Sequence, residues 1–278
     1  MDCAFMLWLF AVSVVASAFG GMLGMASGIF IVPILTMFGH IEIHTAIGAS
    51  IVSVIACSCG GAAPFLENGM TNVRLAIVLE TATTMGALTG VLLVGIVPSS
   101  YLYSLFTVIL FLSARQMLAR RRDPAFAYVP AVTNNWLDSS YPDQELGRDV
   151  SYRVHRVPLG MMLMYGAGLI SALLGIGSGV LTIPAMDAAM RLPIKVSSAT
   201  SNFMIGVTAA ASAGAYFMRG NITTAVAGPV ALGSVLGAIV GARMLLIVSN
   251  DRLRLLFVIV LLALGLQMLL TVFGVQPL

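Results

Sequence analysis

The stretch GMASGIFIVP at residues 24–33 returns as GIGSGVLTIP at residues 175–184, so that two glycine-rich motifs ending in proline lie 151 positions apart. Both motifs are embedded in apolar sequence and neither contains a charged side chain. Similar segments at a fixed spacing are the signature of an internal repeat. The chain is therefore expected to consist of two related halves, each interrupted by glycines near its start.

The same offset aligns the two halves without a gap over most of their length. The matched residues include glycines, serines and glutamines, which general hydrophobicity alone would not keep in register. The repeat therefore extends well beyond the two motifs. It pairs Ser50 with Ser201, Gly69 with Gly220, Gly86 with Gly237, Gly90 with Gly241 and Gln116 with Gln267.

The composition restricts the class of protein. Of the 278 residues, 59% are hydrophobic and 9% are charged, and the mean hydropathy is +1.01. A soluble domain has about 45–50% apolar and about 25% charged residues, because a globule in water needs a polar surface. This composition excludes a soluble enzyme, a nucleic-acid-binding domain and a disordered chain. It predicts an all-α polytopic membrane protein, and its three cysteines are too few for a disulfide framework or a metal site.

Charged residues gather in one stretch. Residues 119–158 hold eleven of the 25 Asp, Glu, Lys and Arg side chains, together with four prolines. This pattern is typical of a solvated linker, and no feature of it indicates a domain of its own. We therefore expect a first membrane repeat at residues 1–118, a polar linker at 119–157 and a second membrane repeat at 158–278.

Each half contains five apolar stretches. The first two in each half are close to or below the roughly 20 residues that cross a bilayer, and glycines separate them. They form either a short hairpin or one broken helix, which gives eight to ten transmembrane segments in all. The stretches are residues 3–19, 20–39, 45–67, 73–96 and 98–118, then 158–174, 175–190, 196–218, 224–248 and 252–273.

Basic residues help to choose between five and four crossings per half. With five crossings and the linker inside the cell, Arg219 alone falls outside, whereas four crossings move Arg191, Lys195, Arg252 and Arg254 outside as well. Because cytoplasmic loops carry an excess of Lys and Arg, five crossings are favoured. An odd number gives the halves opposite orientations in the cell (inner) membrane, with both termini outside and the linker in the cytoplasm. Such an inverted-topology repeat is typical of secondary transporters.

The two glycine motifs form the first candidate site. Glycines allow a membrane helix to break, which exposes N–H groups and the positive end of the next helix. Two such ends from inverted halves would bind an anion near the middle of the membrane. The alternative is close helix packing, because Gly20, Gly24 and Gly28 form a row of small residues. The candidate residues are Gly24, Ser27, Gly28, Gly177, Ser178 and Gly179.

A second repeated feature opens a long apolar helix in each half, GAS at residues 48–50 and ATSN at residues 199–202. Small hydroxyl and amide side chains either cap such a helix or bind the oxygen atoms of a ligand. Beside the glycine motifs they would complete a polar pocket. The candidates are Ser50, Thr200, Ser201 and Asn202, of which Asn202 offers two donors and an acceptor.

With these residues the sequence resembles the TauE/SafE family of membrane transporters, the sulfite exporter family, over nearly the whole chain outside the linker. The resemblance implies transport of a small sulfur-containing anion such as sulfite, sulfoacetate or a related sulfonate. The first half departs from the pattern with Ala26 opposite Gly177 and Ile51 opposite Asn202, so the second half is expected to supply more ligand contacts. The resemblance rests on Gly-x-x-Ser-Gly-x(4)-Pro at 24–33, Gly-x-Gly-Ser-Gly-x(4)-Pro at 175–184, residues 199–202, residues 219–221 and the late Gly-Ala-x-x-Gly of each half.

Ionisable side chains inside the apolar segments are few, which makes them candidates for function. Glu80 lies near the middle of residues 73–96, and its repeat partner is Ala231, so it is not part of the shared scaffold. Glu80 and Asp187 are the candidates for proton coupling, with a local ion pair or a cap at the membrane edge as the alternative. Arg243 lies toward a helix end, where snorkelling explains it.

Three classes of function follow from these features. A secondary transporter of a small anion, with protons or another coupling ion, fits inverted repeats, and no Walker-type loop indicates ATP hydrolysis. A passive anion channel is the alternative. An intramembrane serine protease would need a base beside Ser27 or Ser178, whereas all three histidines lie in predicted loops. We expect a transporter rather than an enzyme, with no cofactor or metal, no nucleic-acid partner, and the anion and membrane lipid as ligands.

Overall fold

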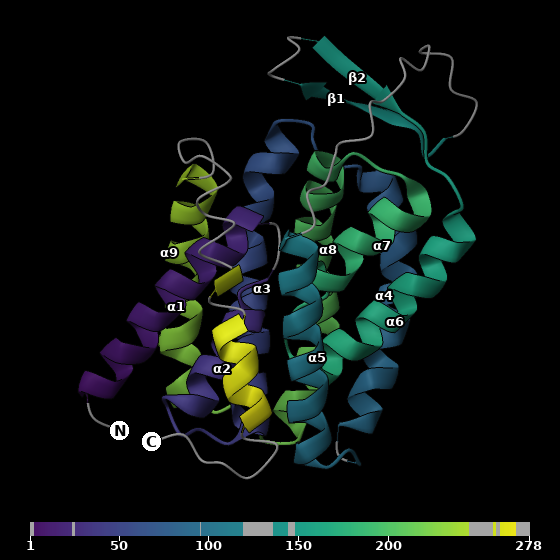
Figure 1. Ribbon diagram of the computed structural model, residues 1–278. Coiled ribbons are helices and arrows are strands. Elements are labelled where there is room, and N and C mark those ends of the chain that lie inside the picture. Colours follow the sequence, from purple (N-terminus) through teal and green to yellow (C-terminus); the bar gives the residue numbers. More distant parts are fainter. Residues whose placement is uncertain are drawn as a thin grey trace.

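The computed structural model describes residues 3–23, 26–94, 96–118, 136–143, 148–244, 258–259 and 262–270. Most of the described chain is helical, and Figure 1 shows one bundle of helices with two short strands at one end. The prediction of an all-α membrane fold is confirmed. The elements are α1 (Cys3–Leu23), α2 (Gly28–Met37), α3 (Ile43–Glu67), α4 (Val73–Leu93), α5 (Ser99–Leu118), β1 (Ser139–Asp143), β2 (Arg148–Tyr152), α6 (Val157–Leu174), α7 (Gly179–Met190), α8 (Ile194–Met218) and α9 (Thr224–Met244), and residues 262–270 are helical as well.

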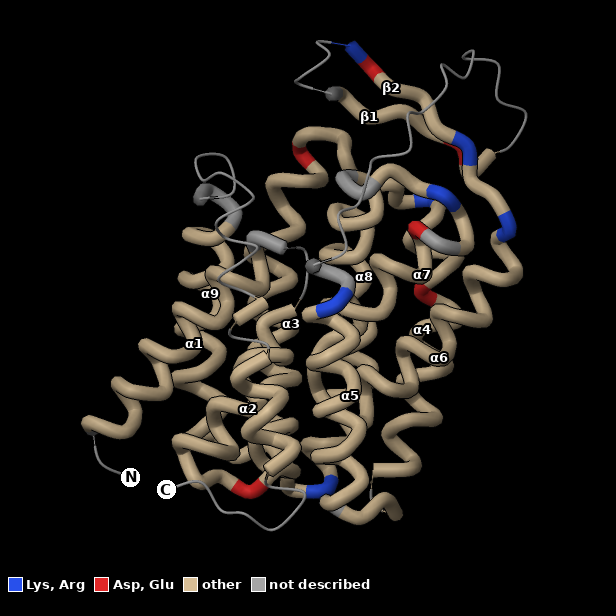
Figure 2. The backbone as a smooth tube through the Cα atoms, in the orientation of Figure 1, with Lys and Arg blue, Asp and Glu red and all other residues tan. Residues whose placement is uncertain are grey.

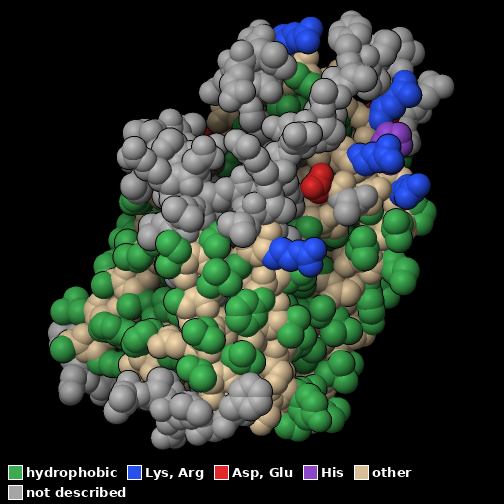
Figure 3. Space-filling model, in the orientation of Figure 1, with side chains coloured by type: hydrophobic (Ala, Val, Ile, Leu, Met, Phe, Trp, Pro, Cys, Tyr) green, Lys and Arg blue, Asp and Glu red, His purple; other side chains and the backbone are tan. Residues whose placement is uncertain are grey.

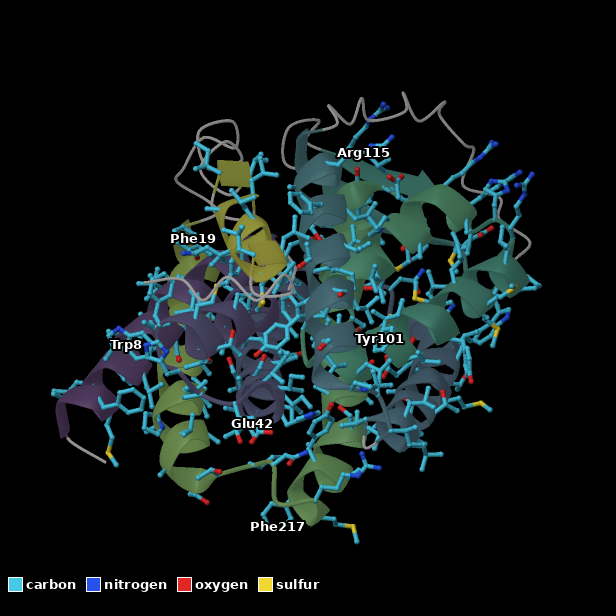
Figure 4. The ribbon with its side chains drawn as sticks, turned by 60° about the horizontal axis from the view of Figure 1, so that its bottom comes forward. Trp8, Phe19, Glu42, Tyr101, Arg115 and Phe217 are labelled. Carbon is cyan, nitrogen blue, oxygen red and sulfur yellow. The ribbon has the colours of Figure 1, made fainter. Side chains whose placement is uncertain are left out.

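The surface of the bundle is apolar along the helices and charged at the ends. Figure 3 shows hydrophobic side chains over the flank of the bundle, with Lys, Arg and His side chains near the strands. Figure 2 places most charged residues at that same end. In Figure 4, Arg115 lies toward the strands, and Glu42 and Phe217 lie toward the opposite end of the bundle. Such a banded surface is typical of a chain that crosses a bilayer.

Five helices of the described chain are long and apolar enough to cross a membrane. Two shorter apolar helices, Gly28–Met37 and Ser100–Arg115, accompany them. The protein is therefore an integral multi-pass membrane protein. The five spans are Ala4–Gly21, Ile43–Glu67, Val73–Leu93, Val157–Leu174 and Thr224–Gly241.

Helices of the two halves begin and end at matching positions. α3 and α8 both span 25 residues, α4 and α9 both span 21, and their boundaries are shifted by 151 positions. In each half a long helix ends before the glycine motif and a short helix containing a proline follows it. These boundaries agree with the sequence repeat. The opposite orientation of the two halves in the membrane stays a prediction.

The halves interleave through close helix pairs, in which α1 packs along α9 and α4 packs along α6, while α3 packs against α8. A Cβ atom added at Gly237 would overlap the carbonyl oxygen of Val14, and one added at Gly86 would overlap that of Tyr165. Small residues allow this close approach of backbones in membrane helices. Gly86 and Gly237 therefore serve close helix packing.

The linker contains a folded hairpin that the sequence analysis did not predict. Strands β1 and β2 pair antiparallel, with Tyr141 opposite Val150. Tyr141 and Tyr152 are 5% and 2% exposed, and with Leu137 and Val154 they join a core cluster that includes apolar residues of α4, α7 and α8. An isolated hairpin has little stability in water, so the packing against helix ends stabilises it. Two five-residue strands are also too short for a clear alternation signal.

Candidate functional site

Both glycine motifs break the chain between a long helix and a short one, as the sequence predicted. In the second motif Gly175 and Gly177 have φ values of 63° and 74°, in the left-handed region that residues with a Cβ atom rarely adopt. Glycine is therefore required there for the break itself. Gly24 of the first motif lies outside the described residues.

Ser27 and Ser178 lie directly before the first residues of α2 and α7, and both are 0% exposed. Neither side chain caps its own helix. The serine carbonyls accept the first helical hydrogen bonds, from N–H groups three and four residues later. The N–H groups before those have no acceptor inside the helix, and the helix dipole makes this end positive. Each motif thus presents helix-end N–H groups without an acceptor inside the helix, and partial positive charge, in the buried part of the bundle.

The two motifs lie in contact with each other. A Cβ atom added at Gly28 would lie 2.6 Å from Ser50 Oγ and would overlap the carbonyl oxygen of Gly175. One added at Gly177 would overlap the Cβ atom of Ala26. The fold therefore brings together segments that are 151 positions apart in the sequence, and the contact leaves no space for a side chain at Gly28 or Gly177.

Ser50 links this contact to the second repeated feature. Its hydroxyl is buried and donates a hydrogen bond of 2.7 Å to the carbonyl oxygen of Gly175. A Cβ atom added at Gly175 would lie 2.7 Å from Cγ2 of Ile47, also on α3. The start of α3 therefore lies directly beside the glycine motif of the other half.

The corresponding residues at the start of α8 have different partners. Thr200 accepts a hydrogen bond of 3.2 Å from the backbone N–H of Asn72, and the Ser201 hydroxyl is 2.8 Å from that of Thr182 in α7. Asn202 is 3% exposed, and its Nδ2 atom has no hydrogen-bond partner among the described residues. Of the three side chains, Asn202 is thus the one that keeps unused donors.

The serines of the two motifs differ in the same way. Ser27 Oγ is 2.8 Å from Ser53 Oγ, which is 2.5 Å from Ser234 Oγ. Ser178 Oγ is buried and has no partner within the described ranges. Buried polar groups in proteins are normally hydrogen-bonded. Ser178 and Asn202 of the second half thus keep buried donors without a partner among the described residues, whereas Ser27 of the first half is bonded to another hydroxyl of the protein.

Glu80 lies in α4 and is 9% exposed. Its Oε1 atom accepts hydrogen bonds from Thr84, at 3.0 Å, and from Thr208 of α8, at 2.7 Å, and its Oε2 atom is buried without a partner in the described chain. Asp187 lies partly buried in α7, where its carbonyl accepts the N–H of Arg191. The two proton-coupling candidates thus have different settings, and Glu80 is the more enclosed.

The buried polar side chains of the described residues are hydroxyls, amides and the carboxyl of Glu80, with no Lys or Arg among them. An anion at the motifs would therefore be bound by N–H, hydroxyl and amide dipoles rather than by an ion pair. Oriented dipoles of this kind bind small oxoanions in many proteins.

Sequence reasoning missed the residues that bond to the candidates. Most of them align with a repeat partner that has no hydroxyl, so a search for shared residues passed over them. The only signal in the sequence was a single hydroxyl within an apolar helix. This signal is weak, because such a hydroxyl commonly bonds to the backbone of its own helix. The missed residues are Ser53, Ser58, Thr182, Thr208 and Ser234.

Comparisons with known proteins agree with a transport function. A family model described as Sulfite exporter TauE/SafE matches residues 9–268. "Probable membrane transporter protein YdhB" of Bacillus subtilis (strain 168) is 26% identical over 223 residues, which are 80% of this chain and 83% of that protein. "Probable membrane transporter protein YunE" of the same organism is 22% identical over 271 residues, 94% of this chain and 96% of the relative. No solved structure matches the chain.

Proposed function

The chain belongs to the sulfite exporter TauE/SafE family and is a membrane transporter, and we propose that it is a secondary transporter of a small sulfur-containing anion such as sulfite, sulfoacetate or a related sulfonate. Alternating access between the two halves would expose the anion to each side in turn. The proposed location is the cell membrane, with both termini outside and the linker in the cytoplasm. No catalytic role is assigned to any residue.

The observation that carries this proposal is the contact between the two glycine motifs beside unused donors. The starts of α2 and α7 bring partial positive charge to the region, and Ser178 Oγ and Asn202 Nδ2 are buried without partners in the described chain. A sulfite or sulfonate group presents several oxygen acceptors around one sulfur atom. It can therefore accept hydrogen bonds from several directions at once.

The donors also bear on the kind of anion. Among the described residues no buried Lys or Arg supplies a full positive charge to offset the removal of a strongly hydrated ion from water. Backbone N–H groups and side-chain dipoles can bind an anion through its oxygen atoms. A sulfonate or sulfite group offers more oxygen acceptors than a carboxylate, which supports sulfur oxoanions as the ligand, and the unpartnered donors of Ser178 and Asn202 support a larger share of contacts for the second half.

A binding experiment tests the substrate class. Purified protein is heated in detergent with sulfite, sulfate, thiosulfate, sulfoacetate and taurine, and with carboxylates as the comparison. A ligand that binds the folded form raises the melting temperature with its concentration. We expect at least one sulfur oxoanion to do so and the carboxylates not to. Stabilisation by carboxylates alone would contradict the proposal.

Two double variants test the site. Ser178→Ala with Asn202→Ala should abolish uptake into liposomes and remove the ligand-dependent stabilisation, while the protein still inserts. The matched control is Ser104→Ala with Asn68→Ala, whose exposed side chains bond only to carbonyls of their own helices. Full transport by the first pair would contradict the site. Saturable exchange of external for internal anion separates a transporter from a passive channel.

A further inference from the structure

Glu80 places a carboxyl group inside the bundle, which the binding of an anion does not require. It lies in the eighth position of α4, and its carboxyl faces a helix of the other half, because Thr208 of α8 donates to its Oε1 atom at 2.7 Å. The corresponding residue of α9 is Ala231. A carboxyl group at this place is therefore an addition to the shared fold, and it connects the first half to the second.

No charged group of the described chain neutralises this carboxyl. Its hydrogen bonds come from Thr84 and Thr208, and it forms no ion pair within the described ranges. Lys195 lies thirteen positions before Thr208 on α8, which is about 20 Å along the helix. The titratable and charged residues on α4 and on the helices around it are Arg74 on α4, Tyr165 on α6, Asp187 on α7, and Lys195 and Tyr216 on α8.

Two of these groups, Arg74 and Tyr216, have partners other than Glu80. The guanidinium of Arg74 donates to the carbonyl of Trp136, and the hydroxyl of Tyr216 donates to the carbonyl of Ala172 at 2.8 Å. An ionised Glu80 would thus be an uncompensated negative charge inside the bundle. Its buried Oε2 atom, without a partner among the described residues, is where a hydrogen can attach.

We propose that Glu80 is the site at which a proton binds and crosses the membrane together with the anion. The inference rests on the proposed function, since it places an anion beside Ser201 and Asn202. Ser201 and Thr208 are seven residues apart, so they lie on one face of α8 and about 10 Å apart along its axis. An anion about 10 Å from the carboxyl, with an effective dielectric constant of about 20, changes the proton affinity of the carboxyl about tenfold. Anion and proton therefore favour each other's binding.

The two threonines position the carboxyl for this role. Both hydroxyls donate to Oε1, which leaves Oε2 to take the proton. A hydrogen bond to an ionised carboxylate is stronger than one to a neutral acid. Protonation therefore weakens the bond between α4 and α8, which join the two halves at this point.

Liposomes that contain the full-length protein and a trapped pH-sensitive dye provide the test. The probes are thiosulfate and methanesulfonate, which stay ionised over the pH range of the dye. An inward anion gradient should acidify the lumen in the wild type, and an inward proton gradient should drive anion accumulation. Glu80→Gln resembles the protonated acid. This variant should still exchange external for internal anion, but its proton-driven accumulation of the anion should be about tenfold lower than in the wild type.

Threonine variants separate positioning from structure. Thr208→Val removes the donor from α8 and should shift the pH dependence of accumulation while exchange continues. Thr81→Val on α4 is the matched control, since that exposed hydroxyl bonds only to the carbonyl of Val78. It should leave both activities unchanged.

The outcomes distinguish the two proposals. If the wild type neither exchanges nor accumulates any sulfur oxoanion, the proposed function fails and the proton site with it. If the wild type exchanges the anion but protons do not follow, the proton site alone is wrong. Retained proton movement in Glu80→Gln also overturns it, as does a folded Glu80→Gln protein that loses exchange and accumulation together.

Discussion

The backbone N–H of Asn72, the residue before α4, donates a hydrogen bond to the hydroxyl of Thr200 in α8, with 3.2 Å between the two atoms. The Asn72 side chain accepts the N–H of Leu75 and donates to the carbonyl of Leu137 and to the hydroxyl of Tyr152. One buried residue thereby joins the first turn of α4, the hairpin of the linker and a candidate binding residue of the other half.

Asn72→Ala should lower the free energy of unfolding by about 2–4 kcal/mol, because it removes a helix cap and leaves buried groups of the hairpin without a partner. The melting temperature in detergent measures the loss, and faster proteolysis within the linker should accompany it. Asn68→Ala is the control, since Asn68 is exposed and its side chain bonds only to the carbonyl of Pro64. Equal effects of the two substitutions would contradict the role of Asn72.

Gly86→Ala should destabilise the contact between α4 and α6, since the new Cβ atom would overlap the carbonyl oxygen of Tyr165. Overpacking of this kind costs about 1–3 kcal/mol. Gly166→Ala on α6 is the comparison, because nothing lies within 4 Å of the added atom there. Gly86→Ala should give a smaller peak of folded protein in size-exclusion chromatography and a lower melting temperature. Gly166→Ala should match the wild type in both. Equal yields would disprove the packing role.

Gly175→Ala separates backbone strain from lack of space. Gly175 and Gly220 both have positive φ, 63° and 75°, but an added Cβ meets Ile47 at Gly175 and open space at Gly220. Backbone strain alone costs about 1–2 kcal/mol, so Gly220→Ala should lower the free energy of unfolding by about that amount. Gly175→Ala should lose more and should also weaken anion binding in the thermal assay. A binding response equal to that of Gly220→Ala would contradict a role of the motif in the site.

Tyr152 gives a test by pH outside the membrane-spanning helices. Burial raises the pKa of its phenol above the ordinary value. The unfolded chain therefore ionises first, so the stability from Tyr152 is complete below about pH 10 and declines as the pH rises further. Tyr152→Phe should reduce the fall of the melting temperature at alkaline pH. Tyr101→Phe, at an exposed position, should show the same fall as the wild type. An unaltered slope in Tyr152→Phe would contradict the burial of the phenol.

Much of the architecture was readable before the structure. An excess of apolar residues over charged ones requires helices in lipid, since a bilayer offers no hydrogen bonds to an open backbone. The repeat predicted both breaks, and it aligned Gly86 with Gly237, which both lie at close contacts between helices. These properties are local, so composition, period and spacing suffice to reveal them.

The details of the site could not be predicted in this way. Ser27 and Ser178 are equivalent in the sequence repeat, yet Ser27 is hydrogen-bonded to Ser53 and Ser178 has no partner in the described chain. The bond between Glu80 and Thr208 spans 128 positions. The hairpin likewise depends on helix ends that are distant in sequence.

The amino-acid sequence by itself determined the class of fold, the two related halves and the places where helices break, because each follows from residues that are neighbours along the chain. Only the tertiary structure decided which of the equivalent polar groups find partners and which have none among the described residues. That choice depends on contacts between helices from different halves, and no pattern along one helix records them.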